Sequence, residues 1–151
     1  MKLIENSEQP IFTISTTARI LKISVHTLRM YEREGLIIPF KKVSSHRLYS
    51  KADINRLNCI RKAINEFKIS INGIKTIYSL IPCWQVTNCD EEERKSCSAF
   101  LTHNNPCWTF QHKENICEDK VCRECEVYRN YAECGEIKEL IKNLTVSQQP
   151  V

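Results

Sequence analysis

Residues 24–50, SVHTLRMYEREGLIIPFKKVSSHRLYS, decide the fold of the N-terminal half of this sequence. Ser24 is a residue type that caps the start of a helix, and Gly35 is one that takes the left-handed conformation after its end. The ten residues between them contain no Gly or Pro, and apolar side chains recur there at three-residue steps. The stretch therefore predicts a helix with a basic outer face and then a basic hairpin, a combination suited to gripping duplex DNA.

These residues resemble the DNA-binding domain of MerR-family transcription regulators. The resemblance rests on residues 27–37 (TLRMYEREGLI), residues 47–50 (RLYS) and the pair Asp53-Ile54, and it covers residues 11–81. The run YEREGL is especially similar to the heat-shock-repressor branch of that family. The resemblance implies a mainly α fold: a winged helix-turn-helix of four helices with a small β-hairpin wing.

Two further stretches shape this domain. The turn at Lys22-Ile23 lacks the glycine that the family often has there, so a non-glycine residue must accept a strained backbone. The wing spans residues 37–49, and its tip, within residues 43–46, has no Asn or Gly to supply a positive φ. A capping-box pattern at Ser50 predicts a third helix, and a fourth helix follows before Pro82.

The predicted DNA contacts come from the first two helices and the wing. Arg29, Lys41 and Arg47 are candidates for phosphate contacts, and His26 is the candidate for reading a base edge. The alternative for the basic residues is a solvated face, and Tyr31 is also a candidate for the core. The full set that we expect to face DNA is Thr16, Arg19, Ser24, His26, Thr27, Arg29, Tyr31, Arg33, Lys41, Lys42, Arg47 and Tyr49.

Charge divides the chain into two halves. Residues 1–82 carry 14 Lys and Arg against 6 Asp and Glu, and residues 83–151 carry 8 against 12, so the net charges are +8 and −4. A basic half joined to an acidic half suits a phosphate-binding module attached to something that stays off DNA. We expect a flexible tail (1–10), the DNA-binding domain (11–82), a cysteine-rich metal or redox module (83–126), a C-terminal helix that could form a dimer seam (127–144) and a disordered tail (145–151).

Cysteine is divided even more sharply, with Cys59 alone in the first 82 residues and eight cysteines between Cys83 and Cys134. The N-terminus lacks the apolar region of a secretion signal, and no stretch has the ~18 apolar residues of a membrane span. We therefore expect a cytoplasmic protein, in which clustered cysteines bind metal or sense redox state more often than they form structural disulfides.

The cysteine-rich segment contains an internal echo, because Pro-Cys-Trp occurs at residues 82–84 and again at residues 106–108. The echo resembles a small "two-CW" module found on bacterial signalling proteins. The C-x-x-C pair at Cys122 and Cys125 has the spacing that lets two thiolates reach one metal. Iron–sulfur and zinc both remain open as cofactors, with Cys83, Cys89, Cys97, Cys107, Cys117, Cys122 and Cys125 as candidate ligands. His103 and His112 are expected at the surface.

These observations favour a regulator whose cysteine module senses redox state, a metal or a gas through a thiolate-bound cofactor. A DNA-binding protein with a purely structural zinc or a partner-recruiting module is the alternative, and an electron carrier is a weaker one. No nucleophile–base or nucleotide-binding motif indicates an enzyme. The expected partners are a second copy of the chain, palindromic promoter DNA and, indirectly, RNA polymerase, since MerR relatives often act by distorting promoters.

Overall fold

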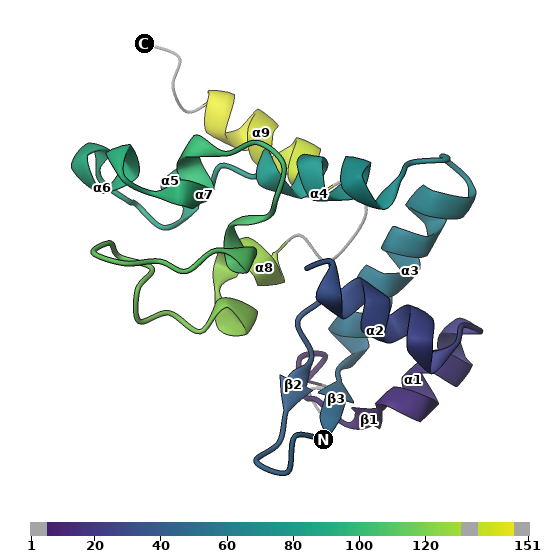
Figure 1. Cartoon of the computed structure of the whole chain (residues 1–151). Coiled ribbons are helices and arrows are strands. Elements are labelled where there is room, and N and C mark those ends of the chain that lie inside the picture. Colours follow the sequence, from purple (N-terminus) through teal and green to yellow (C-terminus); the bar gives the residue numbers. More distant parts are fainter. Residues whose placement is uncertain (1–5, 131–135, 147–151) are drawn as a thin grey trace, which may run out of the picture. The chain divides into compact units, whose positions relative to one another are not determined.

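The computed structural model describes residues 6–130 and 136–146, and the chain divides there into two compact units (Figure 1). The first unit runs to Lys68 and the second begins at Ile69.

The first unit contains the expected helix-turn-helix. Helix α1 (Ile14–Leu21) is capped by Thr13, whose side chain accepts a hydrogen bond from the N–H of Thr16. Lys22 ends this helix in the left-handed conformation, with φ at 56°, so a non-glycine residue does take the strained position in the turn.

Helix α2 (Val25–Arg33) is the predicted recognition helix. The hydroxyl of Ser24 accepts a hydrogen bond from the N–H of Thr27 at 2.9 Å and caps its start. Gly35 follows its end with φ at 76°, as its type predicts. Leu28 and Tyr31 of its inner face are buried, which fixes the helix on the core and leaves the opposite face outward.

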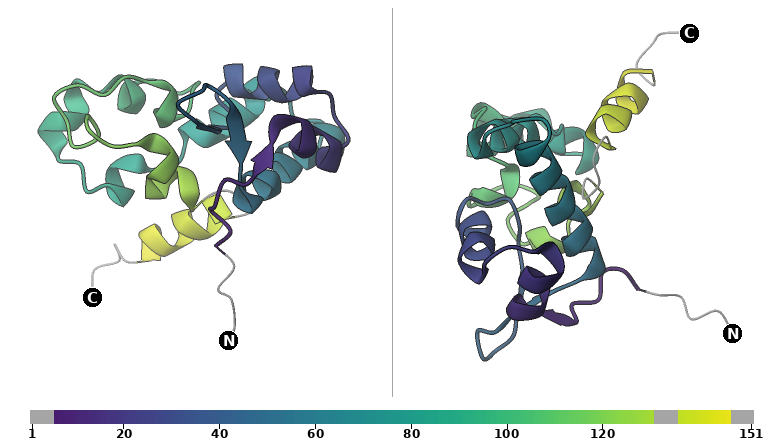
Figure 2. Two further views of the ribbon diagram at one scale, coloured as in Figure 1. Left: turned by 90° about the horizontal axis from the view of Figure 1, so that it is seen from below. Right: turned by 90° about the vertical axis from the view of Figure 1, so that its right-hand side faces the viewer.

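The wing belongs to a three-stranded antiparallel sheet in the order β1-β3-β2. Strand β1 (Phe12–Thr13) pairs with β3 (Arg47–Tyr49), which pairs in turn with the edge strand β2 (Phe40–Lys41). The turn between β2 and β3 projects from the unit, as Figure 2 shows, and Ser45 at its tip has φ at 66°. A serine thus supplies the positive φ that Asn or Gly supplies more easily.

Helix α3 (Lys51–Asn65) completes the first unit. Ser50 and Asp53 form the capping box predicted from their spacing, with both reciprocal hydrogen bonds present. Leu57 and Ile60 belong to an apolar stripe at helical spacing and pack this helix on the core, whereas Phe67, the last residue of that stripe, is 60% exposed beyond the helix end. The stripe therefore holds the helix through only its first three turns.

Helix α4 (Ile71–Ser79) starts at the cap Ser70, but it groups with the second unit rather than with the DNA-binding half. The reason is aromatic packing: its Tyr78 ring lies 5.5 Å from the ring of Trp108. The boundary expected after Pro82 therefore differs from the division at residues 68 and 69 that the contacts define.

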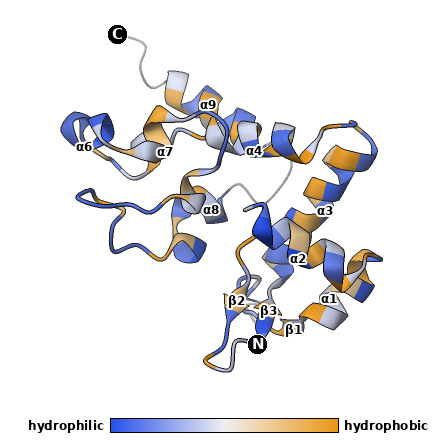
Figure 3. Cartoon of the chain, in the orientation of Figure 1, coloured by the Kyte–Doolittle hydropathy of each residue, from blue (hydrophilic) through white to orange (hydrophobic). Residues whose placement is uncertain are grey.

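Short helical turns joined by loops make up the rest of the second unit. They are α5 (Cys83–Val86), α6 (Glu91–Lys95), α7 (Ser98–Leu101), η1 (Cys107–Thr109), η2 (Cys122–Glu124) and α8 (Glu126–Arg129). Few large aliphatic residues are available here, and the buried side chains include Trp108, Val127 and Tyr128. Helix α6 is hydrophilic along its length (Figure 3), as the acidic run at residues 90–93 predicts.

The C-terminal helix expected over residues 127–144 is not one uninterrupted run. Helix α8 ends at Arg129 with Asn130 as its cap, and α9 spans Glu136–Val146. Thr145 and Val146, expected in a disordered tail, are helical. Tyr131 and Cys134 of the predicted dimer seam, and the tails at residues 1–5 and 147–151, lie outside the described residues. No helix among the described residues combines the length and apolar character that a membrane span needs.

Candidate functional site

The outward face of α2 carries the predicted reading residues. His26, Arg29 and Arg33 are exposed, at positions that follow one another around this face. Among the described residues, no ion pair holds Arg29, Arg33 or the wing residue Lys42. These guanidinium and ammonium groups are therefore available to phosphate or base acceptors.

Glu32 joins the recognition helix to the wing. Its two carboxylate oxygens contact Arg47 Nε at 2.5 Å and Lys41 Nζ at 3.2 Å, on β3 and β2 respectively. The Glu32 side chain is only 16% exposed, and its hydrogen bond raises the pKa of Arg47 above the ordinary guanidinium value. Two of the residues predicted to grip phosphate thus serve first to fix the wing against α2.

The predicted DNA contacts of Tyr31 and Tyr49 are not supported by their positions. The two residues are 3% and 0% exposed, because both rings fill the core of the first unit. Burial raises the pKa of Tyr49 above that of an exposed tyrosine. Ser24 and Thr27 remain near the surface, but their hydroxyls lie 2.9 Å apart and bond each other.

Local hydrogen bonds also engage the predicted contacts of α1. Arg19 is exposed, and its Nη2 lies 3.5 Å from the hydroxyl of Thr16, which also contacts the Thr13 hydroxyl at 3.0 Å. The hydrogen bond to Thr16 directs the Arg19 side chain toward the N-terminal end of α1.

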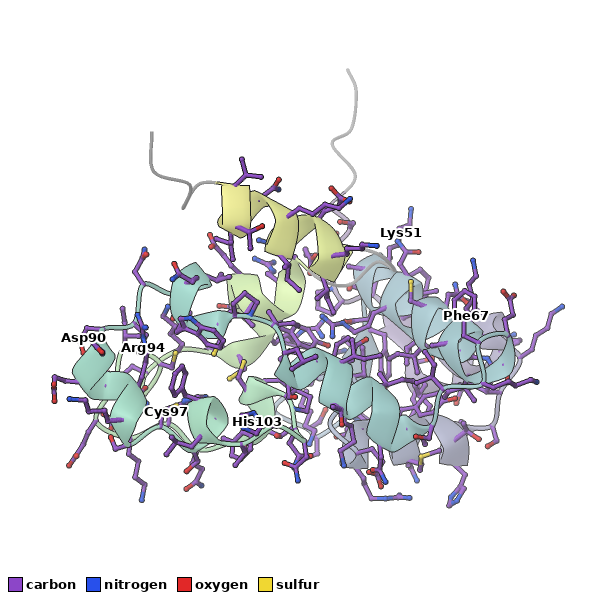
Figure 4. The ribbon with its side chains drawn as sticks, turned by 90° about the horizontal axis from the view of Figure 1, so that it is seen from above. Lys51, Phe67, Asp90, Arg94, Cys97 and His103 are labelled. Carbon is purple, nitrogen blue, oxygen red and sulfur yellow. The ribbon has the colours of Figure 1, made fainter. Side chains whose placement is uncertain are left out.

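The second unit gathers its cysteines around one space. A cavity of about 40 Å³ is lined by all seven cysteines predicted as ligands, and all seven are free thiols. Figure 4 shows sulfur atoms directed into the interior of this unit. Cys134 lies outside the described residues, and Cys59 in α3 is half-buried and disulfide-bonded.

The two Pro-Cys-Trp copies explain part of this convergence. In each copy the proline precedes a helical turn and the cysteine is its first residue, Cys83 in α5 and Cys107 in η1. The Trp84 ring stacks edge-on with Phe100 at 5.1 Å, and the Trp108 ring stacks likewise with Tyr128 at 5.2 Å. Each tryptophan therefore anchors its turn by an aromatic pair and aims the neighbouring thiol into the cavity.

The thiols of the two copies meet. A hydrogen bond between Cys83 and Cys107 lowers the pKa of Cys83 and raises that of Cys107, whose burial acts in the same direction. Burial also raises the pKa of Cys117 and Cys122, and it raises the pKa of Cys89 to about 11 with help from the charge of Glu93. Thiols this close favour a bound cation, which would remove the repulsion between their charged forms.

The donor chemistry of the cavity suits a soft or borderline metal ion, since thiolate sulfur is the ligand that such ions prefer. Among the described residues, however, no three His, Cys, Asp or Glu side chains already meet around one point as ligands. The residues thus fit a metal in kind and in location, and ligation would require the sulfurs to draw together.

Comparison with known proteins bears on the first half of the chain. Residues 12–80 match the family model described as MerR HTH family regulatory protein. This part of the chain is similar to the MerR helix-turn-helix family. Its wing, capped recognition helix and α3 are the elements described above, and the match extends to α4.

Three curated relatives resemble the chain. A putative heat shock protein HspR of Streptomyces coelicolor is 33% identical over 73 residues, which are 48% of each protein, so the chain spans about half the length of this relative. Mercuric resistance operon regulatory proteins of Pseudomonas fluorescens and of a Pseudomonas species are each 26% identical over 129 residues, 85% of this chain and 86% of theirs. No solved structure matches the chain.

Sequence reasoning missed two residues of these sites. Glu32 lies inside the MerR-family pattern, yet an acidic residue among basic ones gave no sign that it would clamp the wing. His112 is half-buried and lines the cysteine cavity, so the expectation of a surface residue is wrong. The echo held the missing signal: Cys89 follows Cys83 by six residues, and His112 follows Cys107 by five.

Proposed function

We propose that this protein is a sequence-specific DNA-binding transcription regulator whose cysteine-rich unit binds a metal ion and thereby controls the DNA-bound state. One observation carries the sensing half of this proposal: all seven described cysteines of the second unit line one cavity as free thiols. A purely structural staple would need four ligands for one zinc ion, and the cavity offers more.

The DNA-binding half follows from the helix-turn-helix. Exposed His26, Arg29 and Arg33 on α2 suit the major groove, and the wing is positioned beside them by Glu32. The MerR-family match and the names of the relatives, two of them operon regulatory proteins, support this assignment. We propose a homodimer on a palindromic promoter, because two copies of α2 related by a two-fold axis would reach successive half-sites.

The metal would be a soft or borderline ion, with zinc as the first candidate. Thiolate-bound zinc would hold the loops of the second unit in one arrangement, since this unit has a small aliphatic core.

The test compares three forms of the full chain on a selected operator: anaerobically zinc-loaded, metal-stripped and oxidised. We expect operator affinity, or transcription in vitro, to differ between loaded and stripped protein by about 5–150-fold, the usual range of coupling between two sites. Cys107→Ser should abolish the difference, and the control Ser98→Ala, at an exposed residue of the same unit, should preserve it.

If zinc binds but all three folded forms act identically at the promoter, the metal is a staple and the sensing proposal is wrong. If the full chain shows no preference for any DNA sequence, the regulator proposal itself is wrong.

A further inference from the structure

His112 lies in the loop after η1 with both ring nitrogens engaged. Its Nε2 lies 3.0 Å from the carbonyl oxygen of Cys107, and its Nδ1 lies 3.9 Å from Cys97 Sγ. A carbonyl oxygen only accepts hydrogen bonds, so the proton of the neutral ring is on Nε2 and the lone pair of Nδ1 faces the sulfur. Histidines that bind metals commonly donate their other N–H to a backbone carbonyl in this way.

Other thiols line the cavity together with Cys97 and His112. Cys89 and Cys97 are both hydrogen-bonded through their backbones to Arg94, and with Cys117 they line the same cavity as His112. Among the other four, Cys83 and Cys107 bond each other, and Cys122 and Cys125 form the C-x-x-C pair, in which the N–H of Cys125 donates to the carbonyl oxygen of Cys122 at 3.1 Å. All seven thiols line one cavity, so the two sets are adjacent.

Hydrogen bonds to the backbone fix the loops that carry the first set. The Arg94 guanidinium donates to the carbonyl oxygen of Cys89 from Nε at 3.1 Å and from Nη2 at 2.8 Å. Asp90 caps α6 behind it, and Figure 4 shows Arg94 between Asp90 and Cys97. Asn115 Oδ1 accepts from the N–H of Cys117 at 2.9 Å. Outer hydrogen bonds of this kind orient the groups that ligate a metal.

We propose that His112 Nδ1 and the thiolates of Cys89, Cys97 and Cys117 form a four-donor metal site, beside a second site made by Cys83, Cys107, Cys122 and Cys125. This rests on the proposed function. Seven thiols and one imidazole make eight donors, the number that two tetrahedral zinc ions require. The assignment also accounts for all seven cysteines. A single site with four cysteine ligands, together with the Cys83–Cys107 pair, would use only six of them.

The test is zinc K-edge X-ray absorption of the full chain loaded anaerobically, together with zinc analysis. We expect about two zinc ions per chain, a sulfur shell at ~2.3 Å and a nitrogen shell at ~2.0–2.1 Å. His112→Ala should remove the nitrogen shell. The matched control is His103→Ala, because His103 is an exposed histidine of the same unit (Figure 4), and it should leave both shells unchanged.

A second measurement avoids mutation. In wild-type chain labelled with ¹⁵N-histidine, zinc should shift the Nδ1 resonance of one histidine whose Nε2 stays protonated. A nitrogen shell that survives in folded His112→Ala, or an Nδ1 resonance unmoved by zinc, would overturn the assignment. Zinc bound through sulfur alone refutes this inference and leaves the proposed function standing, whereas a chain that binds no metal refutes the metal-dependent function as well.

Discussion

Replacing Glu32 with Gln should loosen the wing from the recognition helix. The change removes one negative charge from two contacts, to Arg47 Nε at 2.5 Å and to Lys41 Nζ at 3.2 Å. The Lys41 side chain is 55% exposed, so its pair contributes only about 0.2–1 kcal/mol. The Arg47 contact is partly buried and joins two charged groups, and the amide oxygen of glutamine can still accept a hydrogen bond from the guanidinium. We therefore expect a loss of about 1–2 kcal/mol in the free energy of unfolding.

DNA binding should change in the opposite direction. Glu32→Gln leaves two cations without their carboxylate, and each additional phosphate contact steepens the dependence of log K on log salt by about 0.9. We expect a steeper slope, by up to about two units, and tighter binding to nonspecific duplex at low salt. Glu66→Gln removes an exposed carboxylate at the end of α3 and serves as the control for net charge.

A double-mutant cycle isolates the contact itself. Urea unfolding of Glu32→Gln, Arg47→Gln and the double variant should give a coupling energy of about 1 kcal/mol, within the range for residues in contact. Additive losses would show that the two side chains do not stabilise each other in solution. An unchanged salt slope would show that Lys41 and Arg47 reach phosphate even while Glu32 is present, and the clamp would then have no role in DNA binding.

Three further predictions concern single side chains. His26→Ala should cost about 1–3 kcal/mol at one operator base pair, measured by binding to a panel of operator variants, and a uniform loss would assign His26 to the backbone. Tyr49→Phe should change the free energy of unfolding at pH 7 by less than about 1 kcal/mol, because no hydrogen-bond partner of the buried hydroxyl is found among the described residues. At alkaline pH the same variant should be more stable than the wild type. Burial raises the pKa of Tyr49, so this residue leaves the wild-type free energy of unfolding undiminished below about pH 10 and lowers it as the pH rises further. Urea unfolding of both proteins from pH 8 to 11 checks this. Trp108→Ala should cost about 3–5 kcal/mol in the second unit, seen as an earlier unfolding transition by circular dichroism, and a loss under 1 kcal/mol would mean that the aromatic cluster is not its core.

The sequence predicted the helices of the first unit well because capping and terminating residues determine where these helices begin and end. Ser24, Ser50 and Gly35 act through their own backbone neighbours, and such interactions depend on spacings that the sequence displays. The Lys22 turn was predictable for the same reason, as a position where the chain needs a left-handed residue and has no glycine. Contacts between strands and helices, such as Glu32 with the wing, depend on tertiary geometry and left no local pattern.

The second unit was predictable in its ligand types but not in its arrangement. Cysteine density and the Pro-Cys-Trp echo indicated a shared site, and the cavity agrees with that expectation. Helical spacing over residues 127–144 predicted one helix, yet α8 ends at Arg129. Because this segment contains Gly135 and few aliphatic residues, a continuous helix there would depend on packing against other elements. The periodicity of the sequence carries no information about that packing.

Helix α4 belongs both to the MerR-family match and to the cysteine-rich unit. It lies within the MerR-family match at residues 12–80, yet it packs with the cysteine-rich unit through Tyr78 and Trp108. Trp108 directly follows Cys107, whose thiol bonds Cys83 in the cavity. Drawing these sulfurs onto an ion would shift the η1 turn, and the ring contact would carry that shift to α4. Because packed side chains resist continuous deformation, a displacement at Cys107 would be resolved as a different position of α4 within the second unit rather than absorbed locally.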